Sequence, residues 1–340
     1  MLDQHDFAAT LRTIGRGPKL SRTLSREEAR LAMAAILDGQ VDDLQLGAFL
    51  LLLRYRRETA EELAGMIDAV HERLPPAMSS MRVDLDWPSY ADRHRQQPWF
   101  VLSALLLATS GVRVLMHGIE GARDGFAPMR PVLRALGVSL QDDAAALRNP
   151  FMEGNLAYVG LEQFAPGLER LFALRPRLGV RTAVNTLARA LNPARAPVQL
   201  QGVFHPNYRP LHREVARLRG QATVAIFKGG AGEVQRNPGK PCRVAWLRDG
   251  KAIDEDWPAL VPGGNYDWRS EDLSPARVVA LWRGELAHPQ AVAAVTGTAA
   301  LALRALGRAV DQPSAQELAE ELWAARDRSV VRPDSRLALT

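Results

Sequence analysis

Positively charged side chains are the most distinctive chemical feature of this sequence, and they are concentrated in one part of it. Between positions 163 and 251 the chain has sixteen Lys and Arg residues but four Asp and Glu residues, whereas the net charge of the whole chain is +5. Segregated charge creates a directed field, and nucleic acid responds to it because each neutralised phosphate releases counterions. The alternative is a solvated surface with local ion pairs, but four acids cannot pair with sixteen bases. The candidate phosphate contacts are Arg175, Arg177, Arg181, Arg189, Arg209, Arg213, Arg217 and Lys228.

Three aromatic residues and one histidine could also take part in chemistry, although each has a simpler explanation. Trp87, Tyr90 and Trp99 could stack on the bases of a single-stranded nucleic acid, but we favour a role in filling a pocket. His117 lies in an expected turn, where a structural hydrogen bond is more common than catalysis. The segment Lys228-Gly-Gly-Ala-Gly232 either holds a phosphate with its backbone amides or is an ordinary loop, because it lacks the spacing of a P-loop.

The elements that position these residues begin with a helical region from residue 20 to residue 74. The spacings Ser25-x-x-Glu28 and Thr59-x-x-Glu62 fit the capping box, in which two side chains satisfy backbone amides at a helix start. Residues 44–53 are apolar on nearly every side, which a helix tolerates when most of its surface is buried. Either a second subunit or the rest of a monomeric bundle could cover this helix.

Strands and helices alternate after the Pro75-Pro76 pair, which indicates an α/β domain. We expect strands at 81–86, 112–116, 154–159, 199–204 and 222–227, and helices at 98–110, 130–136, 161–191, 210–218, 290–306 and 314–325. From Trp246 the composition becomes acidic and rich in Pro and Gly, which predicts loops.

Composition bounds the class of protein. A chain of 340 residues is long enough for two domains, each with its own core. The single cysteine, Cys242, excludes an intrachain disulfide and suits a reducing compartment. The start of the chain is acidic where a signal peptide is basic, and the longest apolar run, residues 99–109, is too short to span a bilayer. We therefore expect a cytoplasmic protein that does not enter membranes.

The order of these segments resembles anthranilate phosphoribosyltransferase, of glycosyltransferase family 3. The resemblance is carried by Leu24-Ser-Arg-Glu-Glu-Ala29, Gly47-Ala-Phe-Leu50, Leu178-Gly-Val-Arg-Thr182 with Asn185, and Leu191-Asn-Pro-Ala194. It implies a small helical domain at 1–76, joined by helices from about 162–188, and a larger α/β domain at 77–340 with a central mixed sheet, as in nucleoside phosphorylases. It also implies a cleft between the domains and a homodimer formed through the helical domains.

The residues at the catalytic positions of that family mostly differ here. Trp87-Pro-Ser-Tyr-Ala91 stands where the family has a Gly-Thr-Gly-Gly-Asp loop, and bulky side chains and a proline prevent backbone amides from approaching pyrophosphate. Pro98-Trp-Phe-Val101 replaces an Asn-x-Ser-Thr segment, and Met116-His-Gly-Ile119 replaces Lys-His-Gly-Asn. One acid, Glu233, remains of a metal-binding pair, which is a poor magnesium site. We interpret Trp87, Tyr90, His117, Gly118, Arg175 and Asn185 as a vestigial substrate cleft with no catalytic residue and no metal.

Together these departures resemble the YbiB-like branch of the family, which is described as nucleic-acid-binding. The first hypothesis is a homodimeric, non-catalytic protein that binds DNA or RNA through a basic groove without reading sequence, and needs no cofactor. The second is a transferase or phosphorylase that acts on an altered substrate with a pentosyl phosphate, using Mg²⁺ with phosphoribosyl pyrophosphate. The third is a protein-interaction scaffold that uses the apolar helix at 44–53. The sequence leaves open whether DNA or RNA, and single or double strands, are bound.

Overall fold

The computed structural model describes residues 4–91, 96–119, 129–138, 140, 151, 154–263 and 266–331. The first part of the chain forms four helices, α1 (Gln4–Gly15), α2 (Arg26–Leu37), α3 (Asp43–Arg56) and α4 (Ala60–His71). Both predicted capping boxes are present, because Ser25 and Glu28 cap α2 while Thr59 and Glu62 cap α4. These caps fix the two helix starts, and α2 and α4 then pack closely on each other.

The rest of the chain is organised around one seven-stranded mixed sheet. Its strands are β1 (Leu85–Ser89), β2 (Val114–Gly118), β3 (Leu156–Gly160), β4 (Val198–Val203), β5 (Thr223–Lys228), β6 (Cys242–Arg248) and β7 (Lys251–Trp257). The order across the sheet is β3-β2-β1-β4-β5-β6-β7. The first five strands are parallel, and β6 and β7 are antiparallel to their neighbours. The predicted mixed sheet is therefore confirmed.

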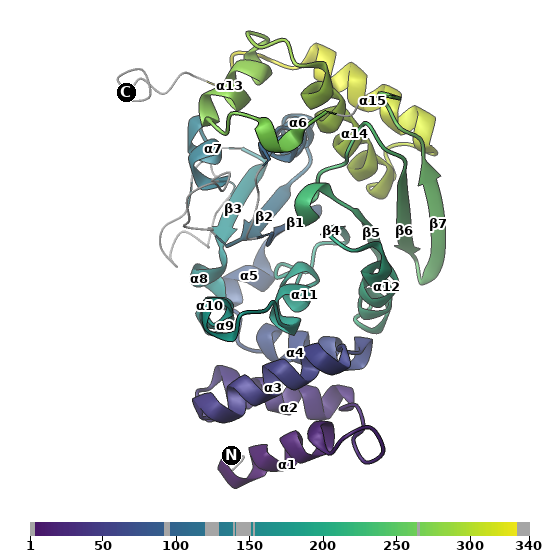
Figure 1. Cartoon of the computed structure of the whole chain (residues 1–340). Coiled ribbons are helices and arrows are strands. Elements are labelled where there is room, and N and C mark those ends of the chain that lie inside the picture. Colours follow the sequence, from purple (N-terminus) through teal and green to yellow (C-terminus); the bar gives the residue numbers. More distant parts are fainter. Residues whose placement is uncertain are drawn as a thin grey trace.

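One face of the sheet is covered by helices that lie far from the helical domain (Figure 1). These are α6 (Phe100–Thr109), α7 (Met129–Ala135), α13 (Pro275–Arg283), α14 (Pro289–Ala305) and α15 (Gln312–Ala325), with the short turn η4 (Trp268–Ser270) beside them. Their apolar side chains form a continuous core with the strands, and α6 is buried along nearly its whole length. The expected buried helix at 98–110 is thus confirmed.

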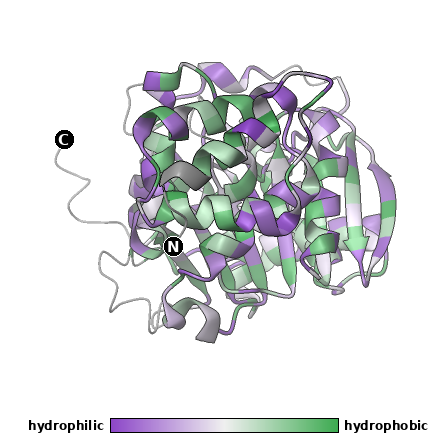
Figure 2. Ribbon diagram, turned by 90° about the horizontal axis from the view of Figure 1, so that it is seen from below, coloured by the Kyte–Doolittle hydropathy of each residue, from purple (hydrophilic) through white to green (hydrophobic). Residues whose placement is uncertain are grey.

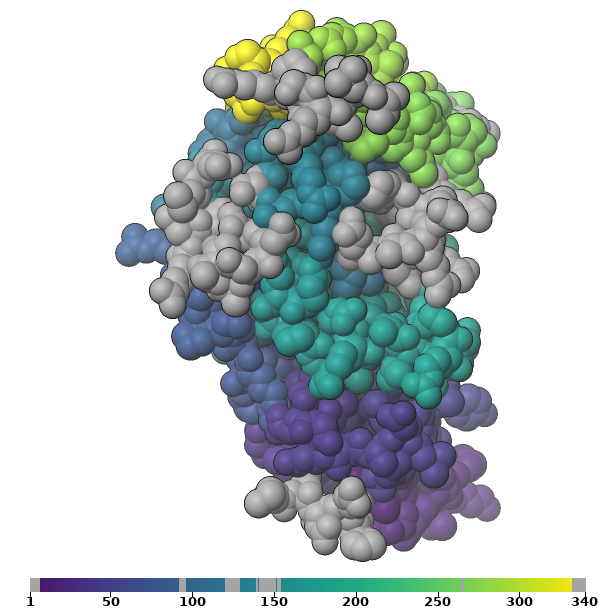
Figure 3. All heavy atoms as spheres, turned by 90° about the vertical axis from the view of Figure 1, so that its left-hand side faces the viewer, coloured from purple at the N-terminus to yellow at the C-terminus, as the bar shows by residue number. Residues whose placement is uncertain are grey.

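The other face of the sheet is covered by helices that also contact the helical domain. They are α5 (Pro76–Ser80), α8 (Leu161–Phe164), α9 (Pro166–Ala173), α10 (Arg175–Leu178), α11 (Ala183–Arg189) and α12 (Arg209–Leu218), with the turns η2 (Pro206–Tyr208) and η3 (Gly230–Gly232) at the strand ends. Figure 3 shows the teal segment that contains α9 and α10 lying directly on the purple helical domain. One hydrophobic cluster joins side chains of α2–α4 to side chains of α9, α11 and β3, so no solvent layer separates the two parts.

Several predicted elements were wrong. The segment after Trp246 is not all loop, because β6 continues to Arg248 and pairs with β7 as a hairpin. Strand β1 begins at Leu85 and not at residue 81. The expected helix at 161–191 is divided into α8–α11 by Pro166, Pro176 and Gly179. The hairpin was missed because the acids at 254–256 have low strand propensity, although they lie on an exposed edge strand that tolerates charge.

Helix α3 is less buried than its apolar sequence predicted. Phe49, Leu50 and Leu53 are buried, whereas Leu44 is 84% exposed and Leu51 is 41% exposed. Figure 2, seen from the side of the helical domain, shows hydrophobic residues among the helices that face the viewer. The bundle of one chain therefore covers one side of α3 and leaves Leu44 and Leu51 exposed, so α3 is not buried on most sides within this chain. Across the described residues, no helix combines the length and the apolar character needed to cross a bilayer.

Candidate functional site: a cationic pocket between the domains

The order of the strands reverses next to β1. The chain adds β2 and β3 on one side of β1 and then places β4 and β5 on the other side. In sheets of this kind the ligand crevice lies outside the carboxyl ends of the strands at the reversal. The two strand ends here are Ser89 of β1 and Val203 of β4, so the functional site is expected beside them.

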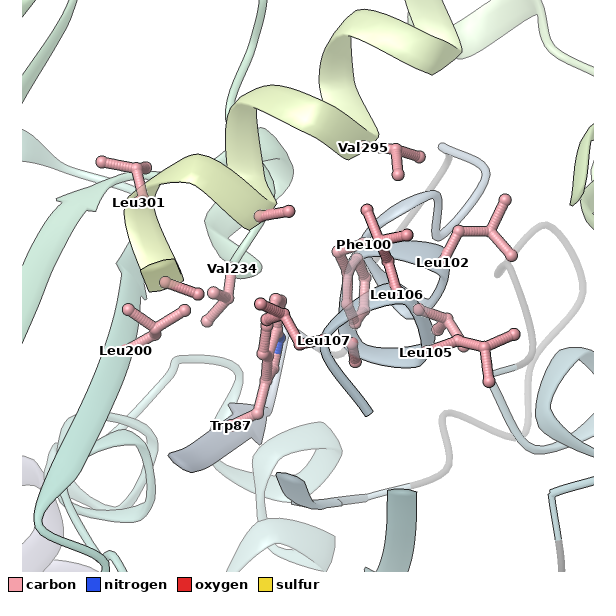
Figure 4. Packing of buried hydrophobic residues seen from close by; sticks show 14 of the residues in the cluster. Trp87, Phe100, Leu102, Leu105, Leu106, Leu107, Leu200, Val234, Val295 and Leu301 are labelled. Atoms are coloured by element: carbon pink, nitrogen blue, oxygen red, sulfur yellow. The ribbon is translucent and has the colours of Figure 1, made fainter. Parts of the chain in front are cut away.

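The position where the resemblance places a glycine-rich phosphate loop is occupied by a strand with large buried side chains. Trp87 has no exposed surface, and its ring stacks on Phe100 with the centroids 6.4 Å apart. Figure 4 shows Trp87 extending from β1 into the cluster that also contains Leu107 and Val234. Trp99 is also fully buried. Neither tryptophan can stack on a nucleobase, and both contribute to the core.

Tyr90 and His117 form a second part of this filling. The Tyr90 hydroxyl lies 2.7 Å from Nδ1 of His117, and Nε2 of His117 lies 3.1 Å from an oxygen of Asp86. The Tyr90 ring also stacks on Phe172, at 5.7 Å between centroids. His117 and Asp86 are fully buried. His117 is therefore buried between a hydrogen-bonded Tyr90 and the nearby carboxylate of Asp86, to which its Nε2 makes no hydrogen bond.

A row of polar side chains continues from Asp86 across the sheet. Gln199 donates its amide to Asp86 at 2.7 Å and accepts a hydrogen bond from Gln201 at 2.6 Å. The side-chain oxygen of Gln201 then lies 2.6 Å from Nδ1 of His212 in α12. All four side chains are buried, and buried polar groups that satisfy one another fix one arrangement of the surrounding core. This row forms a rigid base below the gap between α11 and α12.

Arg189 and Glu233 bring opposite charges into the interior at the strand ends. The Arg189 guanidinium donates to the carbonyl oxygens of Asn185 at 2.7 Å and of Tyr90 at 3.3 Å. Glu233 accepts a hydrogen bond from the backbone amide of Ala91 at 2.7 Å. Burial lowers the pKa of Arg189 to about 10 and raises the pKa of Glu233, and the attraction between the two charges opposes both shifts. Arg189 therefore connects α11 to the segment after β1, and Glu233, which follows η3, connects to the same segment through Ala91.

The backbones themselves leave little room at these strand ends. A Cβ atom on Gly118 would lie 2.1 Å from the carbonyl oxygen of Ser89, and one on Gly202 would lie 2.2 Å from that of Glu233. The close packing of β1 and β2 thus requires glycine at position 118. A role in binding a substrate is not needed to explain this glycine. Within the described part of the chain, no group of three His, Cys, Asp or Glu side chains could hold a metal ion.

An open pocket lies just beside this closed region, between the helical domain and the α/β domain. Its volume is about 90 Å³. Helix α3 contributes Arg54, the start of α11 contributes Arg181 and Asn185, and the segment after β4 contributes Phe204 to Tyr208. Buried Arg189 and His212 complete the wall. No Asp or Glu is among the described residues that line the pocket, so its lining is cationic.

The arginines of this pocket are close enough to repel one another. Burial lowers the pKa of Arg181, and the nearby charge of Arg54 lowers it further. Burial also lowers the pKa of Arg175, with a further contribution from Arg181. Arg54 donates to the Tyr208 hydroxyl at 2.7 Å, which orients its guanidinium toward the pocket wall. Like charges held together in a partly desolvated site create a strong preference for an anion.

Asn185 adds a polar group that has no partner within the described residues. The residue lines the pocket, and its side-chain nitrogen is buried and makes no hydrogen bond to the described residues. A buried donor of this kind costs free energy unless an acceptor or a water molecule satisfies it. The amide and the arginines would therefore suit the same ligand, a small oxyanion such as a phosphate group.

The eight predicted phosphate contacts do not form one continuous strip. Arg181 and Arg189 line the pocket, and the pKa of Arg175 responds to Arg181. Arg177 is exposed on α10 and lies 3.9 Å from Asp43 of α3. Lys228 is exposed at the end of β5, in register with Val203 at the end of β4. These residues surround the gap between the domains and the adjoining strand ends.

The three predicted arginines of α12 have partners of their own. Arg213 forms an ion pair with Asp254 of β7 at 2.6 Å, and Arg217 pairs with Glu214 at 2.6 Å. Arg209 donates to the backbone carbonyl of Arg243 at 2.6 Å. The expectation that these bases lack acidic partners was therefore wrong for two of them. The acid of β7 lies outside the segment in which charges were counted, and the missed hairpin brings it to α12.

Sequence reasoning also missed residues that contribute to the site. Arg54 lies in the helical region, outside the basic segment, and Tyr208 and His205 were not considered. Phe204 was expected to be a strand residue, but it follows β4 and is 48% exposed. A signal was available for Arg54, because three arginines occur at the end of α3, but only the fold shows that this end meets α11.

Comparison with known proteins identifies both parts of the chain. A model of the helical bundle domain of a glycosyl transferase family matches residues 9–74, and a model of the α/β domain of a glycosyl transferase family matches residues 101–255. An anthranilate phosphoribosyltransferase of Methylobacterium nodulans is 34% identical over 67% of this chain and 67% of its own length. An uncharacterized protein of Escherichia coli, YbiB, is 30% identical over 68% of this chain and 73% of its own length.

Solved structures show the same architecture. The crystal structure of anthranilate phosphoribosyltransferase from Thermus thermophilus superposes with a TM-score of 0.71 over 89% of this chain and 92% of that chain, at 26% identity. The enzyme from Saccharomyces cerevisiae, in complex with phosphoribosyl pyrophosphate and magnesium, has a TM-score of 0.74 over 99% of both chains. At 15% identity, the yeast enzyme shows the similarity of fold alone.

Partly buried His71 and buried His212 predict how the free energy of unfolding depends on pH. Burial, with a contribution from Arg219, lowers the pKa of His71 to about 4, and burial, with Arg189, lowers that of His212 to about 3. Below pH 6.5 the unfolded chain takes up protons that the folded protein does not, so the free energy of unfolding falls. The expected loss is about 1.4 kcal/mol per pH unit for each histidine, until the pH approaches the folded pKa.

The substitution His212→Gln should roughly halve the histidine contribution to this slope between about pH 6 and pH 4.5. Urea unfolding at a series of pH values measures it, with exposed His205→Gln as the control. A His212→Gln protein with an unchanged slope would show that His212 is protonated in the folded state.

Proposed function

Because the chain belongs to the glycosyl transferase family with a helical bundle and an α/β domain, in an anthranilate phosphoribosyltransferase-like fold, we propose that it uses the interdomain gap of that fold to bind nucleic acid without transferring a pentosyl group. Binding is to backbone phosphates and does not read sequence, since phosphates carry no sequence information. The similarity to YbiB is consistent with placement in that branch of the family, although YbiB is itself uncharacterized.

The observation that carries this proposal is the cationic pocket at the domain boundary. Arg54 and Arg181 lie close together there, and Asn185 offers a buried amide donor. Exposed Lys228 lies at the adjoining strand end, and Arg177 lies on α10 near α3. Several cations around one gap suit a ligand with repeated phosphates better than a ligand with one.

Loss of pentosyl transfer is supported by the closed strand ends. Trp87 and Tyr90 are buried where a pyrophosphate would need backbone amides, and Pro88 lacks an amide proton. Glu233 accepts a hydrogen bond from Ala91 and interacts with the charge of Arg189, and one carboxylate alone is a poor magnesium site. The buried cysteine, Cys242, suits the cytoplasm, which we propose as the compartment in which the protein binds nucleic acid.

Affinity for a nucleic acid should depend steeply on salt. If about six phosphates are neutralised, the slope of log K against log salt is roughly −5. Replacing both Arg54→Gln and Arg181→Gln should reduce the magnitude of that slope by about two, for every sequence alike. The double variant Arg213→Gln and Arg217→Gln is the matched comparison and should change the slope less, because those arginines already have acidic partners. Fluorescence anisotropy with DNA and RNA oligonucleotides measures all three proteins.

Absence of binding at low salt, or affinity that is indifferent to salt, would exclude nucleic-acid binding. A larger effect of the α12 variant would show that α12, and not the pocket, is the contact surface.

A pentosyl transferase or phosphorylase with an altered substrate is the second candidate. Its support is the retained fold, the His117-Gly118 pair, Arg175, and the anthranilate phosphoribosyltransferases among the relatives. Calorimetry with phosphoribosyl pyrophosphate and Mg²⁺ tests it. We expect no heat of binding in the micromolar range, because the strand ends lack space for pyrophosphate. Micromolar binding that requires Mg²⁺ would support the hypothesis of a pentosyl transferase or phosphorylase. Glu233→Gln would then be the next variant to measure.

We also propose that the protein is a homodimer joined through α3. Leu44, Leu51 and Tyr55 are exposed, and their spacing places them on one side of the helix. The substitution Leu51→Arg should convert the dimer to a monomer, because a charge would be buried at the centre of the contact. Light scattering on the pure chain measures this, with exposed Val310→Arg as the control. A monomeric unmodified chain would instead favour the scaffold hypothesis, in which α3 binds a different protein.

A further inference from the structure

We propose that the ligand is single-stranded and that the exposed ring of Phe204 is a stacking platform for one of its unpaired bases. This inference rests on the proposed binding of nucleic acid and specifies which form is bound. It arises from an observation that the sequence did not suggest, because the aromatic residues first considered for stacking are buried while Phe204 is not.

Phe204 lies where a ligand in the pocket would meet it. It follows Val203, the last residue of β4, and its side chain is 48% exposed. The ring contacts the exposed ring of His205 edge to face, with the centroids 4.8 Å apart and an interplanar angle of 80°. An edge-to-face neighbour can cover one face of the phenyl ring, so His205 leaves at least one face available to a base. A half-exposed phenylalanine at a pocket mouth is costly in water unless a ligand covers it.

Cations lie near this ring. Arg181 and Arg189 share the pocket wall with Phe204, and Lys228 of β5 is in register with Val203. Gly232 lies next to Phe204, and a Cβ atom there would be 3.4 Å from Cβ of Phe204 and 3.7 Å from the Arg189 guanidinium. The glycine therefore keeps the approach between ring and cations open. A base on Phe204 and its own phosphate at the arginines would fit this arrangement.

The chemistry favours a single strand over a duplex. The faces of bases in a duplex are already stacked on one another, so an aromatic ring gains little from them. Proteins that bind single strands without sequence preference combine a cationic groove with aromatic side chains on which bases stack. Every base has such a face, so stacking on Phe204 is compatible with binding that has no sequence preference. An aromatic ring of a protein partner would lack the phosphate that the neighbouring arginines require.

The test uses the full chain and three labelled probes of about 20 nucleotides, which are a thymidine oligomer, a duplex of equal length, and an oligomer of abasic sites. We expect Phe204→Ala to weaken binding of the thymidine oligomer about tenfold and to leave the duplex and abasic probes unchanged. The variant Phe204→Trp should restore binding, because indole also stacks. Val310→Ala, an exposed apolar residue in another part of the protein, is the control.

The outcomes separate the two proposals. If Phe204→Ala binds the three probes as the unmodified protein does, the stacking platform is wrong while nucleic-acid binding stands. If the variant weakens the abasic probe equally, Phe204 acts through the shape of the pocket and the inference also fails. If no probe binds at low salt, nucleic-acid binding itself fails. Thermal unfolding of Phe204→Ala confirms that the half-exposed ring is not needed for folding.

Discussion

The buried pair of Arg189 and Glu233 is the constraint on which the site depends. A charge inside a protein is costly unless an opposite charge and hydrogen bonds compensate it, and removing one partner leaves the other exposed to the full cost. Arg189 meets this condition with two backbone carbonyls and Glu233 with the amide of Ala91. Through these hydrogen bonds both residues hold the segment after β1, and Arg189 also lines the adjoining pocket. Trp87 and Tyr90 fill the remaining space below it.

With the strand ends closed, the position of the helical domain decides what the protein can bind. Arg54 at the end of α3 reaches the segment after β4, where it donates to Tyr208. Arg181 lies at the start of α11, on the other side of the same gap. Neither domain alone places these charges together. The contact between the domains is therefore part of the site, and the apolar cluster that α2–α4 share with α9 and α11 holds the two arginines in place against their mutual repulsion.

The sequence predicted the fold well because its signals are local or belong to a family. The Thr59 and Glu62 pair indicates the start of a helix. The segments between residues 24 and 194 follow the same order as in the family. Charge was harder to interpret. Counting acids within one segment treats neighbours in sequence as neighbours in space, but Arg213 finds Asp254 across a sheet hairpin that composition did not indicate. The exposure of Phe204 depends on where β4 ends, and the contribution of Arg54 depends on domain contact, so neither could be read from local pattern.

The α12 arginines and the pocket arginines should differ in their attraction for a phosphate. Burial and pairing with acids decide this difference more than the number of arginines in each set. An exposed arginine that already holds a carboxylate has little attraction left for a phosphate, because the phosphate must displace that partner and salt screens the gain. Arg54 and Arg181 repel each other in the pocket: the charge of Arg54 lowers the pKa of Arg181, the charge of Glu233 raises it, and partial burial reduces screening between these charges. An anion that enters relieves that repulsion and also satisfies the Asn185 amide. For this reason we place the proposed phosphate contacts at the three guanidinium groups of the pocket and not at the larger number of positive charges on the surface.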